Sequence, residues 1–444
     1  MIGEEQEAEC ARLLDRLRAE KNLDLEAMEF FVRSEMLKLG ARVLQAFFDW
    51  RLGQEPVPTC QDHHRPVPMA CDGKRHKQVR TILGEVTLWR KRWVCPVCDA
   101  VRYAADETLD VQDGLFSPGV RRMVAWAGAM EHSFGLAAQA LQLYGAVQVD
   151  EKEVERIAEA AGRQVEDWRQ REAALAVGLA GCGAPPVRDA PGTFYVQYDG
   201  KGTPMRREEL EGVAGKDGKK AKTREAKLGC VFTQTAFDDE GRPVRDEGST
   251  TYVGAIEDST DFGHRIYGEA VRRGLNRAQN VVALTDGQAY NKTIRNEHFP
   301  NSTWIVDIQH AREHLADFMR DLARRTLEGP DHLRCRDALD EGRIEELLDN
   351  MAGLLPKSGP RRKTGLKAMA YFRKNAEGMR YGEFRRQGLF VATGVMEAGC
   401  RTLVGQRLAQ SGMFWTLRGA NAIIALRCCI LSGLFEDFWE QRAA

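Results

Sequence analysis

Three carboxylates lie far apart in the sequence, each where an expected element would hold it. Asp199 ends the alternating run 194–198, Asp286 follows the apolar run 281–284, and Glu397 lies at the start of an expected helix. Carboxylate oxygens suit Mg²⁺ or Mn²⁺. Two such ions held together activate an attacking water or 3′-hydroxyl and stabilise the leaving oxygen. The three residues therefore indicate phosphodiester cleavage or strand transfer.

Each of these residues also has a simpler interpretation. Asp199 and Asp286 are both followed by glycine, and Asp-Gly is a common turn dipeptide. Glu397 precedes Arg401 by four residues and could form a helix ion pair with it. The combination of two strand-end aspartates with a helical glutamate is what favours a metal site.

A further acidic and histidine pair follows the fifth expected strand. The segment is Asp307-Ile-Gln-His310. His310 could orient Asp307, position a scissile phosphate, or form a buried structural pair with it, and the spacing does not decide among these. His314, one turn later, could belong to the same cluster.

A second group of candidate ligands is rich in cysteine. Cys60 and His63 are followed 32 residues later by Cys95 and Cys98, and the alternating run 79–94 between them is typical of a hairpin. A tetrahedral Zn²⁺ ion takes four soft ligands from two such tight turns. We therefore expect a zinc-ribbon-like module with a structural Zn²⁺.

The first of these two turns leaves its second ligand open. A histidine stands where a cysteine is more usual, and His64 is next to His63. Cys71 and His76 could compete for the same position.

Length and composition are those of a soluble globular protein with several domains. The 444 residues are 29% charged and 43% hydrophobic, and they contain no apolar run long enough to span a membrane. The acidic N-terminus has no secretory signal. Eleven cysteines in an unsecreted chain indicate reduced thiols or metal ligands. We expect a cytoplasmic protein.

The N-terminal part of the chain predicts helices around the cysteine-rich module. Residues 4–50 have helical apolar spacing. Residues 117–172 are helical again, with a turn at 144–145 that gives helix-turn-helix spacing. The helix after this turn is acidic, so it could read bases or serve only in a structural or dimerising bundle. Residues 180–192 read as a linker.

From residue 194 onward the pattern changes to strands and helices in a recognisable order. The expected strands are 194–199, 227–237, 249–256, 280–285 and 303–307, and the expected helices between them are 262–273 and 289–297. Three antiparallel strands followed by strand-helix alternation is the order of a ribonuclease-H-like core. Residues 311–386 read as an all-helical insertion, after which the chain returns to the core with the helix of Glu397.

The fold class expected is therefore multidomain α+β. It has N-terminal helices, a zinc-ribbon-like module, a helical, helix-turn-helix-like domain, and a ribonuclease-H-like core interrupted by the insertion. The expected boundaries are 1–55, 56–110, 111–180, 190–310, 311–386 and 387–444.

The net charge of −1 is distributed unevenly along the chain. Residues 357–386 carry ten Lys and Arg against two Glu, and residues 60–103 carry nine against four acidic residues. Segregated charge fits a protein with one surface for DNA, although single basic runs are often solvated helix faces. The candidate DNA contacts are Lys219, Lys220, Lys222, Arg224, Arg361, Arg362 and Lys363.

An aromatic segment near the C-terminus, Met413-Phe414-Trp415, has two interpretations. It could insert against a distorted base, but core packing is the interpretation we favour. Four cysteines lie in apolar surroundings and are expected in the core: Cys230, Cys400, Cys428 and Cys429.

Several longer stretches carry a family resemblance. The chain resembles the DDE transposases of bacterial insertion sequences, specifically the ISKra family, which is related to the Mutator-like group. The likeness runs from about residue 60 to the C-terminus and is most specific from residue 194 on. The matching stretches are 223–235, 249–257, 306–315, 394–400 and 406–422.

The resemblance implies a DDE triad at Asp199, Asp286 and Glu397, and places the family's D-x-x-H motif on Asp307 and His310. It implies a transposase that binds terminal inverted repeats of double-stranded DNA, cleaves at the element ends and joins the freed 3′-hydroxyls to target DNA. It also implies a homodimer or higher oligomer, associated with the bacterial nucleoid. Two rival hypotheses are a non-catalytic, transposase-derived DNA-binding regulator and a two-metal DNA nuclease.

Overall fold

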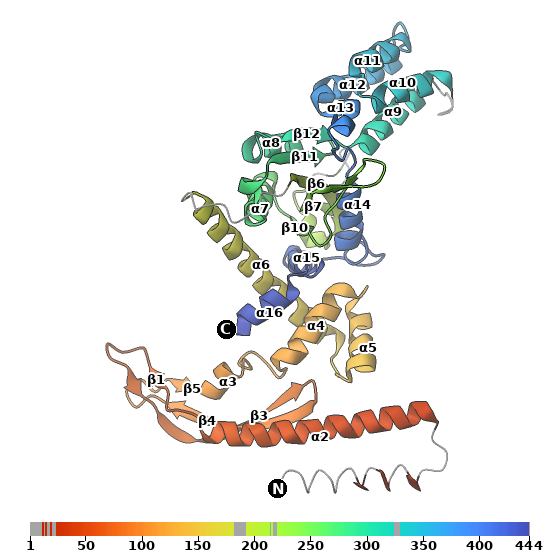
Figure 1. Ribbon diagram of the computed structural model, residues 1–444. Coiled ribbons are helices and arrows are strands. Elements are labelled where there is room, and N and C mark those ends of the chain that lie inside the picture. Colours follow the sequence, from red (N-terminus) through yellow and green to blue (C-terminus); the bar gives the residue numbers. More distant parts are fainter. Residues whose placement is uncertain are drawn as a thin grey trace. The chain divides into compact units, whose positions relative to one another are not determined.

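The computed structural model describes residues 24–181, 192–213, 215, 220–323 and 329–443, together with residues 11, 12, 14, 15, 18 and 19 (Figure 1). Lys219 and most of the expected linker at 180–192 lie outside these residues. Backbone contacts divide the chain into two compact units: unit 1 is Met1–Gly128 with Phe134–Ile157, and unit 2 is Ala129–Ser133 with Ala158–Ala444. The six finer boundaries expected from the sequence stay predictions.

Unit 1 is built on a long helix that packs against a β-hairpin. Helix α2 (Leu25–Gly53) confirms the expected N-terminal helix over its described length, and it begins at an Asp24 side chain that accepts a hydrogen bond from the Ala27 amide. Strands β3 (Ala70–Thr81) and β4 (Gly84–Val94) form the hairpin. Three short strands complete the module: β1 (Thr59–Cys60), β2 (Val67–Pro68) and β5 (Val101–Arg102).

One face of α2 covers the hairpin. Leu44, Phe48 and Leu52 of α2 pack with Val79 and Leu88 of the two strands in a common apolar cluster. The Gln45 side chain also pairs with the backbone of Thr87, accepting from its N–H at 2.7 Å and donating to its carbonyl at 2.7 Å. These contacts orient α2 along the hairpin and leave its other face free of it.

The remaining helices of unit 1 form a small apolar core. They are α4 (Pro118–Met130), α5 (Phe134–Gly145) and the start of α6 (Glu151–Gly181), whereas the short helix α3 (Ala104–Thr108) contributes Ala105 to the cluster between α2 and the hairpin. Val120 and Val124 of α4, Leu141 of α5, and Val154 and Ile157 of α6 are buried together. The division between the two units passes through α4 and α6.

Unit 2 contains a mixed five-stranded sheet in the order β10-β7-β6-β11-β12. Its strands are β6 (Thr193–Pro204), β7 (Thr223–Gln234), β10 (Thr251–Ala255), β11 (Asn280–Thr285) and β12 (Thr303–Val306). The first three strands pair antiparallel, and β11 lies parallel to both β6 and β12. A short hairpin, β8 (Ala236–Phe237) and β9 (Pro243–Val244), extends from the end of β7.

Helices cover both faces of this sheet. Figure 1 shows α7 (Ser259–Arg272) and α8 (Ala289–His298) on one side and α14 (Gly394–Cys400) on the other. Successive residues of β6 alternate between these faces: Tyr198 packs with Phe262 of α7, whereas Gln197 accepts a hydrogen bond from the Met396 amide of α14. The remaining short elements are η1 (Arg207–Leu210), η3 (Leu275–Arg277) and the π-helical turn η5 (Arg401–Gly405).

The C-terminal helices α15 (Leu417–Leu431) and α16 (Phe435–Ala443) complete unit 2, with α15 packed against β10. Cys230, Cys400, Cys428 and Cys429 are all buried, which confirms the expectation that they belong to the core. None of the described helices combines the length and the apolar character needed to cross a membrane.

The segment between β12 and α14 is helical, as expected from the sequence. It comprises α9 (Ile308–Ala323), α10 (Pro330–Asp340), α11 (Ile344–Gly353), α12 (Pro360–Asn375), η4 (Ala376–Met379) and α13 (Tyr381–Arg386). The Tyr381 hydroxyl donates to the Val306 carbonyl at 2.9 Å. This bond attaches the end of the helical segment to β12, close to the point where the segment begins.

Candidate metal centres

The first candidate centre lies where β6 and β11 run side by side. Thr285, the last residue of β11, is paired in parallel register with Tyr198 of β6. The residues that follow, Asp286 and Asp199, therefore meet at the same position along the sheet. Ligand atoms of Asp199, Asp286 and His310 all lie within 4.8 Å of one another.

Asp286 is buried, and three donors fix its carboxylate. Its Oδ1 accepts from the Gln288 amide at 3.0 Å and from the Asn291 side chain at 2.5 Å, and its Oδ2 accepts from the Gln288 side chain at 2.6 Å. Gln288 directly precedes α8, which begins at Ala289, and Asn291 lies in the first turn of this helix. A helix that starts directly after a strand end thus aims its first residues at the site. The sequence analysis did not single out Gln288 and Asn291, although their place in the first turn after Asp286 would have been the signal.

Asp199 accepts a hydrogen bond from the Gly200 amide at 2.7 Å. Burial raises the pKa of its carboxyl, and the neighbouring Asp286 and Glu225 carboxylates raise it further. Carboxylates crowded in this way repel one another, and a cation among them relieves the repulsion. The donor set of two carboxylates and an imidazole fits a hard divalent cation such as Mg²⁺ or Mn²⁺.

His310 comes from the first turn of α9 and is half-buried. Burial alone would lower the pKa of its imidazole, but the carboxylates of Asp307, Glu313, Asp286 and Asp199 outweigh that effect and raise it. Its Nδ1 lies 3.2 Å from a Glu313 oxygen. The structure thus brings His310 to the two aspartates.

Asp307 is close to this group but is engaged elsewhere. Its Oδ1 accepts from the Gln309 amide at 2.6 Å, at the start of α9. Its Oδ2 accepts from the Thr393 amide at 2.8 Å and from the Thr393 hydroxyl. Asp307 therefore joins the start of α9 to the residue that precedes α14.

Glu397 is not part of the group formed by Asp199, Asp286 and His310. It is exposed on α14, which packs against β6 and β7. One turn further along, the Cys400 sulphur lies 3.8 Å from Oδ2 of Asp199. Among the described side chains, Glu397 forms no ion pair with Arg401. The structure places the helix of Glu397 beside Asp199 without bringing the two carboxylates together.

The second candidate centre lies in unit 1. Ligand atoms of Cys60, His63, Cys95 and Cys98 lie within 4.8 Å of one another. The Cys60 and Cys98 sulphurs are 3.8 Å apart, and His63 Nε2 is 3.3 Å from the Cys95 sulphur. Tetrahedral Zn²⁺ with Zn–S bonds of about 2.3 Å separates its sulphur ligands by about 3.8 Å. The spacing of this group therefore fits zinc.

The electrostatics of Cys95 suit a metal-binding thiolate. Burial raises the pKa of this thiol, but hydrogen bonds from the Val97 and Cys98 amides and from His63 lower it to about 6. The competing ligands left open by the sequence lie elsewhere: Cys71 is exposed, with its sulphur 3.7 Å from the Gly73 carbonyl, and the His76 ring contacts the Trp89 ring at a tilt of 53°.

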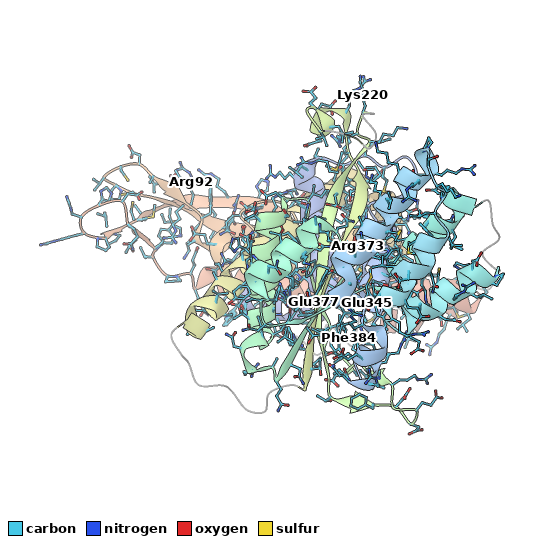
Figure 2. All side chains as sticks on the ribbon, turned by 90° about the horizontal axis from the view of Figure 1, so that it is seen from above. Arg92, Lys220, Glu345, Arg373, Glu377 and Phe384 are labelled. Carbon is cyan, nitrogen blue, oxygen red and sulfur yellow. The ribbon has the colours of Figure 1, made fainter. Side chains whose placement is uncertain are left out.

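The candidate DNA contacts lie on two elements of unit 2. Lys222 and Arg224 lie where β7 begins, and Lys220 precedes them on the same hairpin arm (Figure 2). Arg224 pairs with Thr203, four residues along β6 from Asp199, which corresponds to about 13 Å. Arg361, Arg362 and Lys363 occupy the first turn of α12.

Helix α12 reaches the first centre through Tyr371. The Tyr371 hydroxyl donates to the Asp286 carbonyl at 3.3 Å, and its ring stacks on His314 with centroids 3.9 Å apart. His314 is therefore a ring partner of Tyr371, and it is not among the grouped ligand atoms.

The two aromatic residues of the segment near the C-terminus, Phe414 and Trp415, differ in burial. Trp415 is buried, and its indole N–H donates to the Leu408 carbonyl at 3.0 Å, which confirms core packing for this residue. Phe414 is 62% exposed. The possibility of a base contact therefore remains for Phe414 alone.

Comparison with protein-family models and with curated proteins finds no match for this chain. Among solved structures, the Drosophila P element transposase strand transfer complex is similar over 77% of this chain and 84% of that one, at 9% sequence identity and a TM-score of 0.24.

Proposed function

We propose that this chain is a metal-dependent DNA transposase of the ISKra type, which binds terminal inverted repeats and catalyses DNA cleavage and strand transfer. The observation that carries the proposal is the meeting of Asp286, directly after the end of β11, with Asp199 at the matching position along β6, and with His310 beside them. The sheet order, with three antiparallel strands followed by two parallel ones, supports a ribonuclease-H-like core.

The proposal gives each residue of the first centre a separate task. Asp199 and Asp286 hold the metal, with Glu397 as the third carboxylate and His310 at the scissile phosphate. When bound, the divalent cations activate the attacking oxygen and stabilise the leaving oxygen. Gln288 and Asn291 orient Asp286, and Asp307 holds the start of α9 against the residue before α14.

The remaining parts of the chain supply DNA binding in this proposal. The Cys60, His63, Cys95 and Cys98 group holds a structural Zn²⁺, and its module together with the helices of unit 1 recognises the element ends. Helix α12 carries cations beside the first centre. On a helix with 3.6 residues per turn, Lys363, Lys367 and Lys374 fall on the same side as Tyr371, whose hydroxyl contacts Asp286. DNA entering the site would pass along this side of α12.

Cleavage of an end-labelled duplex tests the proposal. The duplex carries the terminal repeat and its flank, and Mg²⁺ or Mn²⁺ is added to the full-length chain. We expect nicks at the repeat junction by the wild type. In Asp199→Asn, in Asp286→Asn and in Glu397→Gln the nicks should vanish while binding of the repeat is retained, because these changes remove a charge and keep the side-chain shape.

Other outcomes select the rival functions. Repeat binding without nicking by the wild type would identify a DNA-binding regulator. Metal-dependent nicking without preference for the repeat junction would identify a nuclease. Nicking by Glu397→Gln at the wild-type level would remove Glu397 from the metal site and leave Asp199 and Asp286 in it.

A further inference from the structure

Helix α2 has a second apolar face that stays exposed among the described residues of unit 1. Leu44, Phe48 and Leu52 point to the hairpin. On a different side of the helix, six large apolar side chains are 40–57% exposed. We call them the α2 stripe: Met28, Val32, Met36, Val43, Phe47 and Trp50.

The α2 stripe is continuous along the helix. At 3.6 residues per turn its six members fall within roughly 100° of arc, which is the width of one interaction face. From Met28 to Trp50 this face is about 33 Å long. A contiguous apolar surface of this extent in a soluble protein marks an interface.

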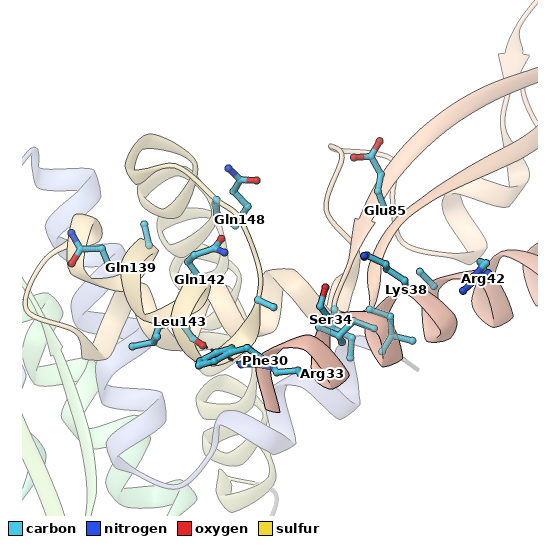
Figure 3. A pocket seen from close by; sticks show the side chains of 18 residues that line it. Phe30, Arg33, Ser34, Lys38, Arg42, Glu85, Gln139, Gln142, Leu143 and Gln148 are labelled. Atoms are coloured by element: carbon cyan, nitrogen blue, oxygen red, sulfur yellow. Dashed lines mark hydrogen bonds between the residues drawn. The ribbon is translucent and has the colours of Figure 1, made fainter. Parts of the chain in front are cut away.

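The α2 stripe is also distinct from the pocket beside it. A pocket of about 1280 Å³ is bordered by α2, by the hairpin turn at residues 82–85 and by α5. Figure 3 shows Phe30, Arg33 and Ser34 of α2 lining it, and none of the six members of the stripe does so. Arg33 donates to the Leu143 carbonyl at 3.2 Å on this side. The pocket side of α2 is thus engaged by other parts of unit 1, whereas the described part of the unit leaves the stripe exposed.

We propose that the α2 stripe is the contact between two copies of this chain, paired antiparallel along α2. The first argument is the order of side chains, which is nearly palindromic about residues 39 and 40. In an antiparallel pair centred there, Met28 meets Trp50 of the second copy, Val32 meets Phe47, and Met36 meets Val43. Such a two-fold contact uses the same surface on both copies, and each pair combines a smaller side chain with a larger one.

The second argument is charge. Glu26 and Glu29 lie at the edge of the stripe near the start of α2, and Arg51 lies at the same edge near its end. Antiparallel pairing places the two glutamates of one copy beside Arg51 of the other, twice in each dimer. Parallel pairing would instead place this edge of the two copies on opposite sides of the contact, so that neither Glu29 nor Arg51 would meet its counter-charge.

The third argument is area. Large side chains of roughly 150–250 Å² that are about half exposed leave roughly 600 Å² on the six residues of the stripe. Covering this area on both copies removes about 1,200 Å², which is within the range of stable specific interfaces. This inference uses no feature of the metal centres. Its failure would therefore not affect the proposed function, and failure of the proposed function would not affect this inference.

The mass of the full-length chain in solution tests the pairing. By light scattering after size exclusion, or by sedimentation equilibrium, we expect the wild type to have the mass of a dimer at micromolar concentration. Val43→Glu places two unpaired carboxylates in each dimer interface and should raise the dissociation constant roughly 100-fold or more. Zinc content and circular dichroism should stay unchanged, which separates lost pairing from lost folding.

Exchanging the charges of Glu29 and Arg51 then tests whether the stripe contacts a second copy and whether the two copies run antiparallel. Glu29→Arg and Arg51→Glu should each weaken the dimer by bringing like charges together, and the double variant should restore it. A monomeric wild type would overturn the proposal, since the stripe would then be covered within the chain or stay open. A dimer that survives Val43→Glu, or single charge variants that the double variant does not rescue, would overturn it as well.

Discussion

At the scale of single residues, the first centre depends on how firmly Asp286 is oriented. A metal ligand with free rotation loses entropy on binding, whereas one already held by hydrogen bonds does not. Asn291 is fully buried, and its side-chain amide donates to Asp286 while its backbone carbonyl accepts from the Tyr198 hydroxyl at 2.9 Å. Asn291 therefore connects the Asp286 carboxylate to the packing of β6 against α8.

Replacing Asn291 should weaken metal binding without removing a ligand. Asn291→Leu keeps the volume and deletes the amide donor to Asp286, so we expect the affinity for Mn²⁺ to fall about 10- to 100-fold. Titration followed by electron paramagnetic resonance would measure it, and cleavage at saturating Mn²⁺ should recover much of the wild-type rate. Thr293→Ala on the same helix is the control, because Thr293 bonds only the Ala289 carbonyl. Unchanged affinity in Asn291→Leu would mean that Asn291 serves the packing of α8 alone.

The individual candidate residues were predictable from sequence to different degrees. Asp199 and Asp286 come together because each directly follows one of two apolar runs that pair in parallel register, from Thr193 and Asn280 to Tyr198 and Thr285. The position of Glu397 depends on where α14 packs after a long helical segment, and no spacing rule determines that. The motif of Asp307 suggests a metal ligand, but in the structure this residue accepts a hydrogen bond from Thr393, 86 positions away. Neither local sequence pattern indicates that these two residues meet.

At the scale of elements, the second half of α6 is joined to α7 by a buried charge network. Glu269 of α7 is 2% exposed and accepts from Arg169 of α6 at 2.6 Å and from Arg272 at 2.8 Å. The Thr251 hydroxyl at the start of β10 donates to the same carboxylate at 2.5 Å. Three elements of unit 2 thus converge on one side chain.

Loss of this carboxylate should destabilise unit 2, and by an amount that depends on pH. Glu269→Gln leaves Arg169 without its counter-charge, and we expect the free energy of unfolding to fall by roughly 3 kcal/mol at pH 7. Burial alone would raise the pKa of Glu269, but Arg169, Arg272 and Thr251 lower it below its ordinary value of 4.5. A lowered pKa gives stability that is present above pH 4.5 and is lost as the pH falls below it.

Urea unfolding of the wild type and of Glu269→Gln between about pH 3.5 and about pH 7 measures this difference. The difference in free energy of unfolding between the two proteins should be constant above about pH 5 and should become smaller below about pH 4.5. Asp317→Asn is the control, since its pair with Arg320 is exposed and surface pairs contribute little. A gap that does not change with pH would mean that Glu269 acts through packing and not through charge.

Element boundaries show where sequence patterns end and tertiary contacts take over. The alternating run predicts a strand that ends at residue 199, yet β6 continues to Pro204 through two glycines. It does so because β7 supplies pairing partners across the whole hairpin. The polar stretch at residues 74–77 does not alternate in hydrophobicity, and it still forms β3, because β4 lies beside it.

At the scale of the whole molecule, cations are numerous but are used differently in the two units. In unit 1, several basic side chains of residues 60–103 form ion pairs. Arg90 and Lys77 pair with Asp106, and Arg92 pairs with Asp72. In unit 2, the described side chains of α12 include Lys363, Lys367 and Lys374, which form no ion pair. A count of charges along the sequence could not separate these two cases, because the acidic partners in unit 1 lie up to 29 residues away.

The free cations of α12 lead to a test by salt. Each lysine that neutralises a DNA phosphate contributes about 0.9 to the slope of log affinity against log salt concentration. Replacing Lys363, Lys367 and Lys374 by glutamine should therefore reduce the slope by roughly 2 to 3, with an equal effect on specific and non-specific duplexes. Fluorescence anisotropy of a labelled duplex at several salt concentrations measures the slope.

A matched triple variant removes the same charge from the same helical segment. Arg334, Arg336 and Arg343 are each paired with an acidic side chain of α10 or α11, so their replacement by glutamine should leave the slope near the wild-type value. Equal slopes for all three proteins would exclude α12 from the DNA interface. Equal reductions in both variants would mean that the segment acts through its total charge. A reduction confined to the α12 variant would place phosphates along the side of the helix whose Tyr371 contacts Asp286, and so tie DNA binding to the candidate metal centre.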